Sequence, residues 1–279
     1  MAKRFKSAEI VADAEGRQYH VGLKPGDVAP RILMCGDPAR ARRVASYFDK
    51  AREPILCREF VTITGTYKKL PITVIATGMG PDNTEIAFVE LSQITKNPTF
   101  IRIGSSGALK KGIELGDLVV STGAVRMENT STAFVCEGYP AVAHHEVVLS
   151  LLEAAKAKKF PFHAGLTATA PGFYGAQGRR VPGFPPRDPE IPAKLDQMNV
   201  ANLEMESSCL FTLATLSGAR AGAVCAIYAN RHANKFIDSD TKDEAERRCI
   251  ETGLAAFEVL EKIDKAKGRA AHWVPSMGI

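Results

Sequence analysis

Short apolar runs alternate along this chain with longer segments of helical periodicity, and this alternation restricts the possible folds more than any other feature. The expected strands are residues 31–34, 61–68, 72–76, 99–103, 118–121, 165–169 and 223–228. Several are continuous apolar runs, which is typical of strands buried on both faces. The expected helices are residues 39–49, 83–96, 146–158, 204–217 and 241–267. The pattern predicts an α/β fold in which helices flank a mixed or parallel sheet.

Length, composition and cysteine usage agree with one globular domain. The chain has 279 residues, of which 45% are hydrophobic and 24% charged, close to the average for globular proteins. No change in composition marks a boundary, so we expect a single domain over residues 1–279. The cysteines at 35, 57, 136, 209, 225 and 249 form no C-x-x-C pair. Reduced, buried thiols in a cytoplasmic protein are therefore expected.

Several classes of protein are disfavoured by what the sequence lacks. No apolar run approaches the roughly 18–20 residues of a membrane span, and the polar segment 1–17 has no apolar core of a signal peptide. The net charge of +5 is spread along the chain without an aromatic-interleaved basic motif, so no nucleic-acid partner is expected. The dinucleotide fingerprint is absent, which argues against a Rossmann-type dehydrogenase.

A first candidate site lies where the strand at 31–34 ends. Gly36 would let the backbone approach a ligand closely, and Asp37-Pro38 begins a helix that carries Arg40. The exposed N–H groups of a helix start and the added guanidinium favour an anion there. Since Gly-Asp-Pro is also a common turn, a purely structural turn is the alternative.

A second candidate follows the strand at 99–103. Arg102 lies in an apolar strand, where a charge is costly unless it is paired. The following Gly104-Ser105-Ser106-Gly107 offers backbone N–H groups and hydroxyls, which suit phosphate oxygens. The alternative is an arginine in a salt bridge in the core.

Two further segments carry polar groups near apolar elements. Glu204 and Glu206 open an apolar helix and point to different faces, so one can enter a site while the other caps the helix or pairs. Phe173, Gln177 and Arg179 combine an aromatic ring, an amide and a guanidinium, which suit a planar heterocycle. Residues 181–192 carry five of the 16 prolines and are expected to form a long exposed loop, either a lid or a plain connection.

Taken in order, these segments resemble the nucleoside phosphorylase-I family, and within it the uridine phosphorylase branch. The resemblance covers about residues 18–264. It is carried by Tyr-His-Val-Gly-Leu at 19–23, Gly-Asp-Pro-x-Arg at 36–40, Arg-Glu-Phe at 58–60, Thr-Gly-Met-Gly at 77–80, Arg-Ile-Gly-Ser-Ser-Gly-Ala at 102–108, Gln-Gly-Arg at 177–179, Glu-Met-Glu-Ser at 204–207 and Asn-Arg at 230–231. The Gln-x-Arg element indicates the uridine branch.

The resemblance implies a single α/β domain with a distorted mixed sheet flanked by helices. It also implies a homodimer, or a hexamer built from such dimers, in which each active site is completed by the neighbouring subunit. The implied activity is that of a pentosyltransferase: uridine and phosphate are converted reversibly to uracil and ribose 1-phosphate. Deoxyuridine is an expected second substrate. Inorganic phosphate is the co-substrate, and the reaction requires no cofactor.

Carried over by position, the resemblance assigns roles to individual residues. Phosphate binding falls to Gly36, Arg40, Arg102 and Ser105, with Arg58 supplied by the neighbouring subunit. Ribose binding falls to Met205 and Glu206, with His20 supplied by the neighbouring subunit. Base binding falls to Phe173, Gln177 and Arg179. The expected catalytic residues are Arg102, Glu206 and Arg179. Glu59, Met79 and Asn83 match a position for a structural cation at the dimer interface, either potassium or a divalent ion such as calcium.

The sequence departs from the family pattern in places and leaves alternatives open. Tyr228 is bulkier than the aliphatic residue expected near the base, and Asn230-Arg231 stands where purine-specific relatives carry an aspartate. A broader pyrimidine or purine nucleoside phosphorylase is the nearest alternative. A hydrolytic nucleosidase would have no reason to keep Arg40, Arg58 and Arg102 together. A non-catalytic nucleoside-binding or storage protein would need neither these arginines nor Glu206.

Overall fold

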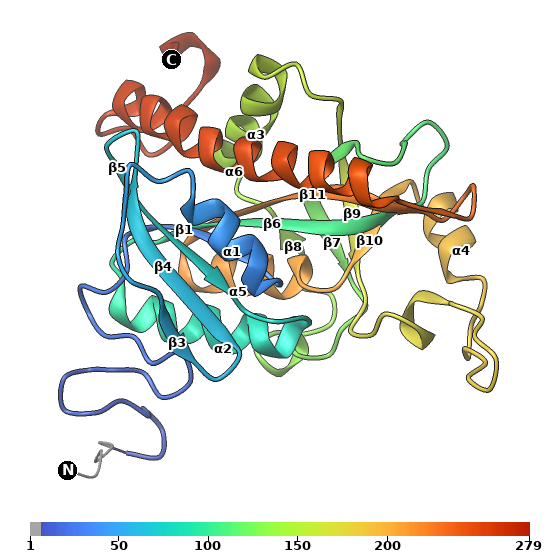
Figure 1. Ribbon diagram of the computed structural model, residues 1–279, viewed down its shortest axis with the longest axis horizontal. Coiled ribbons are helices and arrows are strands. Elements are labelled where there is room, and N and C mark those ends of the chain that lie inside the picture. Colours follow the sequence, from blue (N-terminus) through green and yellow to red (C-terminus); the bar gives the residue numbers. More distant parts are fainter. Residues whose placement is uncertain (1–6) are drawn as a thin grey trace.

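The computed structural model describes residues 7–279 and shows one twisted mixed sheet with helices on both faces (Figure 1). The strands are β1 (Arg31–Cys35), β2 (Lys50–Ala51), β3 (Ile55–Cys57), β4 (Phe60–Tyr67), β5 (Leu70–Ala76), β6 (Thr99–Ala108), β7 (Leu118–Arg126), β8 (Ala141–Val142), β9 (Phe162–Thr169), β10 (Val200–Glu204), β11 (Arg220–Asn230) and β12 (Lys235–Phe236). Residues 1–6, part of the segment expected to lack a signal peptide, lie outside the described residues.

The helices are amphipathic or buried and follow the strands they cover. They are α1 (Pro38–Ala45), α2 (Pro81–Ile94), α3 (His145–Ala157), α4 (Ile191–Gln197), α5 (Ser207–Ser217) and α6 (Ser239–Lys267). Over residues 7–279, no helix is both long enough and apolar enough to cross a lipid bilayer.

The sheet is distorted because part of it closes on itself. Its strand order is β12-β11-β7-β9-β10-β6-β1-β5-β4-β2, and β11 also pairs with β6. The strands β6, β11, β7, β9 and β10 therefore form a ring, from which β1, β5 and β4 extend as an open sheet. Both parallel pairs, such as β1 with β6, and antiparallel pairs, such as β11 with β7, occur. The predicted fold class is confirmed.

Two apolar layers hold the helices on the sheet. On one face α1, α3 and α6 pack through residues such as Val44, Leu151 and Phe257, and on the other α2 and α5 pack through Leu91 and Phe211. Figure 1 shows α3 and α6 on one side of the central strands and α2 on the other. Burying both faces of the central strands explains why their sequences are continuous apolar runs.

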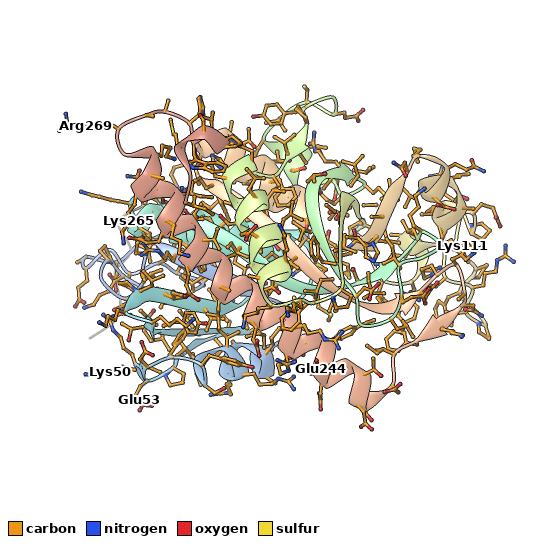
Figure 2. All side chains as sticks on the ribbon, turned by 90° about the horizontal axis from the view of Figure 1, so that it is seen from above. Lys50, Glu53, Lys111, Glu244, Lys265 and Arg269 are labelled. Carbon is orange, nitrogen blue, oxygen red and sulfur yellow. The ribbon has the colours of Figure 1, made fainter. Side chains whose placement is uncertain are left out.

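Charged side chains of both signs lie around the periphery of this core. In Figure 2, Lys50 lies near Glu53 and Lys265 lies near Arg269, whereas Lys111 lies at the opposite end of the molecule. Charged side chains thus occur at both ends of the surface seen in this view.

Three of the predicted boundaries are wrong, and the first two are wrong because pairing between distant strands leaves no signal in a local sequence pattern. Residues 104–107 continue β6 because they pair with β11, Gly104 opposite Cys225 and Gly107 opposite Ala229. The helix expected at 204–217 begins at Ser207, since Glu204 ends β10, a strand the pattern missed. The proline-rich loop ends at Glu190, where α4 starts with Pro192 in its first turn, a position that tolerates proline.

Candidate active site

A cavity of about 540 Å³ lies at the carboxyl ends of β1, β5, β10 and β11 and beside the second half of β6. Ligand sites in open α/β sheets occupy this kind of position. The cavity collects most of the residues assigned to the substrates from the sequence. Those that line it are Gly36, Arg40, Glu59, Met79, Arg102, Ser105, Phe173, Gln177, Arg179, Met205 and Glu206.

Gly36 lies where the loops after β1 and β5 make their closest approach. The N–H of Gly78 donates to the carbonyl of Gly36 at 3.0 Å. A Cβ atom added at Gly36 would lie 2.9 Å from the carbonyl oxygen of Gly78, a distance that real Cβ atoms essentially never show. The missing side chain therefore lets the two loops close this end of the cavity.

Replacing Gly36 by alanine is expected to lower kcat/KM for the phosphorolysis that the resemblance implies by about 10- to 100-fold, because the new methyl group pushes the two loops apart and misplaces the groups they carry. Steady-state kinetics against uridine and phosphate measure the change. Gly138→Ala is the matched control, since a Cβ there meets nothing within 4 Å. Equal kcat/KM values for the two variants would contradict the role assigned to this close approach.

Arg40 enters the cavity from the start of α1. Asp37 caps the helix by accepting a hydrogen bond from the N–H of Ala39 at 2.8 Å, and Pro38 occupies the first turn. The Arg40 side chain is 8% exposed. Its Nη1 donates to the carbonyl of Ile103 at 3.3 Å, and its Nη2 donates to Glu246 at 3.3 Å. The sequence alternative of a plain surface turn does not account for a buried guanidinium at this place.

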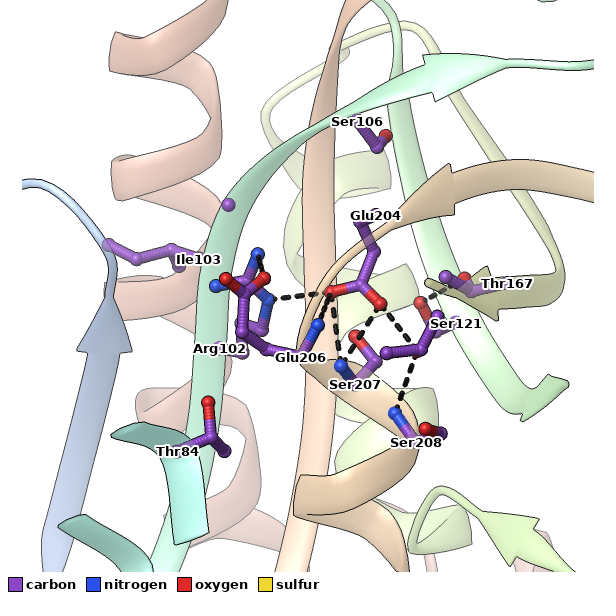
Figure 3. Close-up of polar contacts among 12 residues, drawn as sticks. Thr84, Arg102, Ile103, Ser106, Ser121, Thr167, Glu204, Glu206, Ser207 and Ser208 are labelled. Carbon is purple, nitrogen blue, oxygen red and sulfur yellow. Dashed lines mark hydrogen bonds and ion pairs between the residues drawn. The ribbon is translucent and has the colours of Figure 1, made fainter. Parts of the chain in front are cut away.

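Arg102 forms the centre of a buried ionic cluster (Figure 3). Its Nε donates to Oε2 of Glu204 at 2.9 Å, and its Nη2 forms an ion pair with Glu206. A Cβ at Gly104 would lie 2.8 Å from Nη2 of Arg102, so the glycine leaves room for the guanidinium. Both interpretations of Arg102 from the sequence therefore apply. The residue forms salt bridges in the core, and it also lines the cavity.

The two carboxylates of Glu204 and Glu206 have different surroundings. Glu204 accepts hydrogen bonds from the N–H groups of Glu206 and Ser207 at 2.9 and 3.0 Å, and from the Thr169 hydroxyl at 2.6 Å. It therefore fixes the start of α5. Glu206 accepts from the Gly80 N–H at 2.7 Å. Burial raises the pKa of the Glu206 carboxyl, while Arg102 opposes this shift.

The base-binding prediction concerns the opposite end of the cavity. Gln177 is buried there, on a short 3-10 turn (Gly175–Gln177). The Arg179 guanidinium carbon lies 3.9 Å from the centre of the Phe173 ring, and its Nε donates to the Phe173 carbonyl at 2.9 Å. Burial, together with the nearby charge of Arg231, lowers the pKa of Arg179 to about 10. The guanidinium thus covers one face of the Phe173 ring.

His20 and Arg58 lie together, and neither lines the cavity. The Arg58 guanidinium carbon is 4.8 Å from the centre of the Tyr19 ring, and that ring meets the His20 ring edge-on at 4.8 Å. His20 Nδ1 is 2.7 Å from Glu90. Arg58 has a left-handed backbone with φ of 54°, an uncommon conformation for a residue with a side chain. These are the two residues assigned to a neighbouring subunit.

The residues matched to a cation position are only partly brought together. Glu59 and Met79 line the cavity, whereas Asn83 does not. The Asn83 amide donates to the carbonyl of Thr77 at 2.8 Å. Over residues 7–279, no group of three or more histidine, cysteine, aspartate or glutamate side chains is arranged to hold a metal ion.

Three residues near these groups make contacts that the sequence did not predict. Tyr228, which was expected near the base, lines the cavity together with Gln177 and Arg179, and its hydroxyl lies 3.4 Å from Nη2 of Arg40. Glu246, which pairs with Arg40, had a signal: it follows Ala245 and precedes Cys249 on the apolar stripe of α6, where a carboxylate needs a partner. Arg231 lines a second, more open hollow of about 780 Å³ that also contains Arg179.

Comparison with known proteins places this geometry in a family. The sequence model of the phosphorylase superfamily matches residues 30–263. A uridine phosphorylase of Thermococcus kodakarensis is 44% identical over 99% of each chain, and a guanosine phosphorylase of Halorubrum lacusprofundi is 33% identical over 82% of this chain and 90% of its own. A Trypanosoma brucei nucleoside phosphorylase with uridine phosphorylase activity superposes with a TM-score of 0.84, at 29% identity over 88% of this chain and 98% of its own. The chain belongs to the phosphorylase superfamily.

Proposed function

We propose that this protein is a uridine phosphorylase, a pentosyltransferase that converts uridine and phosphate reversibly to uracil and ribose 1-phosphate. The observation that carries the proposal is one cavity lined by Arg40 and Arg102, by Glu206, and by the amide of Gln177 with the guanidinium of Arg179. The similarity to the Thermococcus kodakarensis and Trypanosoma brucei enzymes supports it. Deoxyuridine differs only at the 2′ position and is proposed as a second substrate.

The phosphate end of the proposed site consists of Gly36, Arg40, Arg102 and Ser105. A guanidinium is permanently charged and donates hydrogen bonds in a fork that matches phosphate oxygens. Bound there, a phosphate oxygen would attack C1′ of the ribose while the bond from C1′ to the base breaks and the base leaves with the electron pair. Holding both substrates in one cavity removes much of the entropic barrier.

The ribose is proposed to lie over Met205 and Glu206. As the glycosidic bond stretches, C1′ and the ring oxygen acquire positive charge. The carboxylate of Glu206, held by Gly80 and Arg102, would accept hydrogen bonds from the ribose hydroxyls and favour this cation from one side, while phosphate favours it from the other.

The base end of the proposed site can distinguish uracil from cytosine. Arg179 only donates hydrogen bonds, whereas Gln177 both donates and accepts. Uracil has an acceptor oxygen at C4, which a guanidinium satisfies as negative charge develops on the leaving base. Cytosine has an amino donor there, which would remain unpaired, so cytidine should be rejected strongly.

A broader specificity that includes purine nucleosides is the second candidate. The hollow of about 780 Å³ adjoins Arg179 and would give a two-ring base room to extend, and one similar relative is a guanosine phosphorylase. Asn230 opposes this candidate, because its side chain donates to the Ile113 carbonyl at 3.1 Å and accepts from the Ala233 N–H at 2.8 Å, so it is engaged by the protein itself.

We further propose that the active unit is a homodimer, alone or within a hexamer, in which His20 and Arg58 enter the neighbour's cavity. Charge supports this. Within one chain the arginines of the predicted phosphate site are already paired with carboxylates, Arg40 with Glu246, and Arg102 with Glu204 and Glu206. A dianion added beside these carboxylates is favoured by a further cation, which Arg58 of a second subunit would provide. We also propose that a structural metal cation binds near Glu59, that the reaction needs no cofactor, and that the protein is cytoplasmic.

Ultraviolet absorbance tests the reaction directly. Uridine, cytidine and inosine are each incubated with the protein, with and without phosphate, and release of the free base is followed. Uracil release that depends on phosphate, with no release from cytidine or inosine, is the expected result. Uracil release without phosphate would identify a hydrolase, hypoxanthine release would favour the broader specificity, and no release at all would favour a binding protein.

A further inference from the structure

Tyr228 and Glu246 contact the predicted phosphate arginine from two other elements. Tyr228 is on β11 and Glu246 on α6, whereas Arg40 is on α1. Nη2 of Arg40 donates to the Tyr228 hydroxyl at 3.4 Å and to Oε2 of Glu246 at 3.3 Å. The Tyr228 hydroxyl in turn donates to the same Oε2 at 3.3 Å. Three side chains from distant parts of the sequence thus form a closed triangle at the cavity wall.

Arg40 and Glu246 are buried and Tyr228 is partly buried, and these side chains keep the protonation states that their contacts require. The Glu246 side chain is 2% exposed. Its other oxygen lies 2.6 Å from Nε of Arg43, so one carboxylate joins two arginines of α1. Burial raises the pKa of the Tyr228 hydroxyl well above its usual range, so the hydroxyl stays protonated and can donate.

Arg40 nevertheless retains unused hydrogen-bonding capacity. Its three contacts with protein acceptors are 3.3 to 3.4 Å long, at the weak end of the usual range. Its buried Nε has no hydrogen-bond partner among the described residues. A buried guanidinium held by weak contacts is oriented by its neighbours but not saturated by them, which is the condition for binding a further anion.

We propose that Tyr228 and Glu246 are positioning residues for phosphate: Glu246 balances the charge of Arg40 and holds it on α6, and the Tyr228 hydroxyl directs its Nη2 group. This inference rests on the proposed function, because it takes Arg40 to bind phosphate. It assigns the large side chain of Tyr228 to the phosphate end of the site, whereas the sequence had suggested an effect on the base.

Tyr228→Phe tests the hydroxyl while keeping the ring. Loss of one neutral hydrogen bond is expected to raise the KM for phosphate by about three- to tenfold, with the KM for uridine changed less than about twofold. Tyr67→Phe, on β4 and outside the cavity, is the matched control and should leave both values unchanged. Parallel rises in both KM values, or an unchanged KM for phosphate, would overturn the proposal.

Glu246→Gln tests the charge without relying on turnover. Removing the carboxylate leaves the buried cation of Arg40 without its partner, and added phosphate would partly replace that carboxylate. The increase in Tm produced by inorganic phosphate should therefore be larger in this variant than in the unmodified chain. An equal or smaller increase would contradict the role of Glu246. If the unmodified chain shows neither a phosphate-dependent Tm nor phosphorolysis, the proposed function itself fails.

Discussion

Arg102→Lys is expected to lower kcat/KM for phosphate by about 100- to 1,000-fold, the largest effect of any conservative substitution in the cavity. Arg102 contacts Glu204 through Nε and Glu206 through Nη2 at the same time. A lysine ammonium keeps the charge but cannot present two donors in this fixed geometry. The phosphate and the ribose would both lose alignment, since Glu206 is held by the same guanidinium. Steady-state kinetics with phosphate as the varied substrate measure the loss.

Arg220→Lys provides the control for this experiment. Arg220 also pairs with buried and half-buried carboxylates, donating to Asp264 at 2.7 Å, but it begins β11 at the end of the sheet away from the cavity. The Arg220→Lys substitution should lower the Tm by about as much as Arg102→Lys does, while leaving kcat/KM within about twofold of that of the unmodified chain. If Arg102→Lys retains kcat/KM within threefold, Arg102 does not bind phosphate in the way proposed.

Two inactive variants are expected to restore activity when they form a hybrid dimer. Glu206→Gln removes a group from the cavity of its own chain, and Arg58→Ala removes a group that we propose enters the neighbour's cavity. Each homodimer should lose activity by roughly 100-fold or more. In the hybrid, the cavity of the Arg58→Ala chain retains Glu206 and receives Arg58 from the other chain. With one of two sites intact, the hybrid should show about half of the original activity.

Co-expression of the two variants with different affinity tags allows the hybrid to be purified and assayed. A hybrid of Glu206→Gln with Arg102→Lys is the matched control, because both substitutions lie in the cavity of their own chain and no site is left intact. That hybrid should remain inactive. An inactive hybrid of Glu206→Gln with Arg58→Ala would show that Arg58 acts within its own chain, whereas an active Arg58→Ala homodimer would show that Arg58 is not needed.

The fold was largely predictable from the sequence because its central elements are long and periodic. The buried strands and the amphipathic helix at 241–267 lie within one to five residues of the observed bounds. What the pattern missed depends on pairing between distant segments. Gly104 to Gly107 have no strand character of their own, and only the neighbouring β11 makes them part of β6. β10 was missed because its polar end, at Glu204, was attributed to the helix that follows.

The candidate site, like the fold, was predictable only in part. Residues in compact motifs, such as Gly36 with Arg40 or Glu204 with Glu206, were found from the chain alone. Glu246 was not, although it contacts Arg40 directly. Its place beside the apolar stripe of α6 indicates that it needs a partner, but the two residues are separated by 206 positions and nothing local indicates that the partner is Arg40. The contacts of the Tyr228 hydroxyl with Arg40 and Glu246 were not predicted for a related reason: its direction depends on the packing of α1 and α6.

The ion pair between Arg102 and Glu206 has a consequence for how two substrates share one cavity. Each of these groups is the other's partner, yet each is proposed to serve a different substrate. Whichever substrate binds first must weaken that pair, and the second then meets a group already released. The binding free energies of phosphate and nucleoside are therefore linked, and by reciprocity each should increase the affinity of the other by the same factor. The buried ion pair between Arg102 and Glu206 would thus couple the binding of phosphate to the binding of the nucleoside before any covalent bond changes.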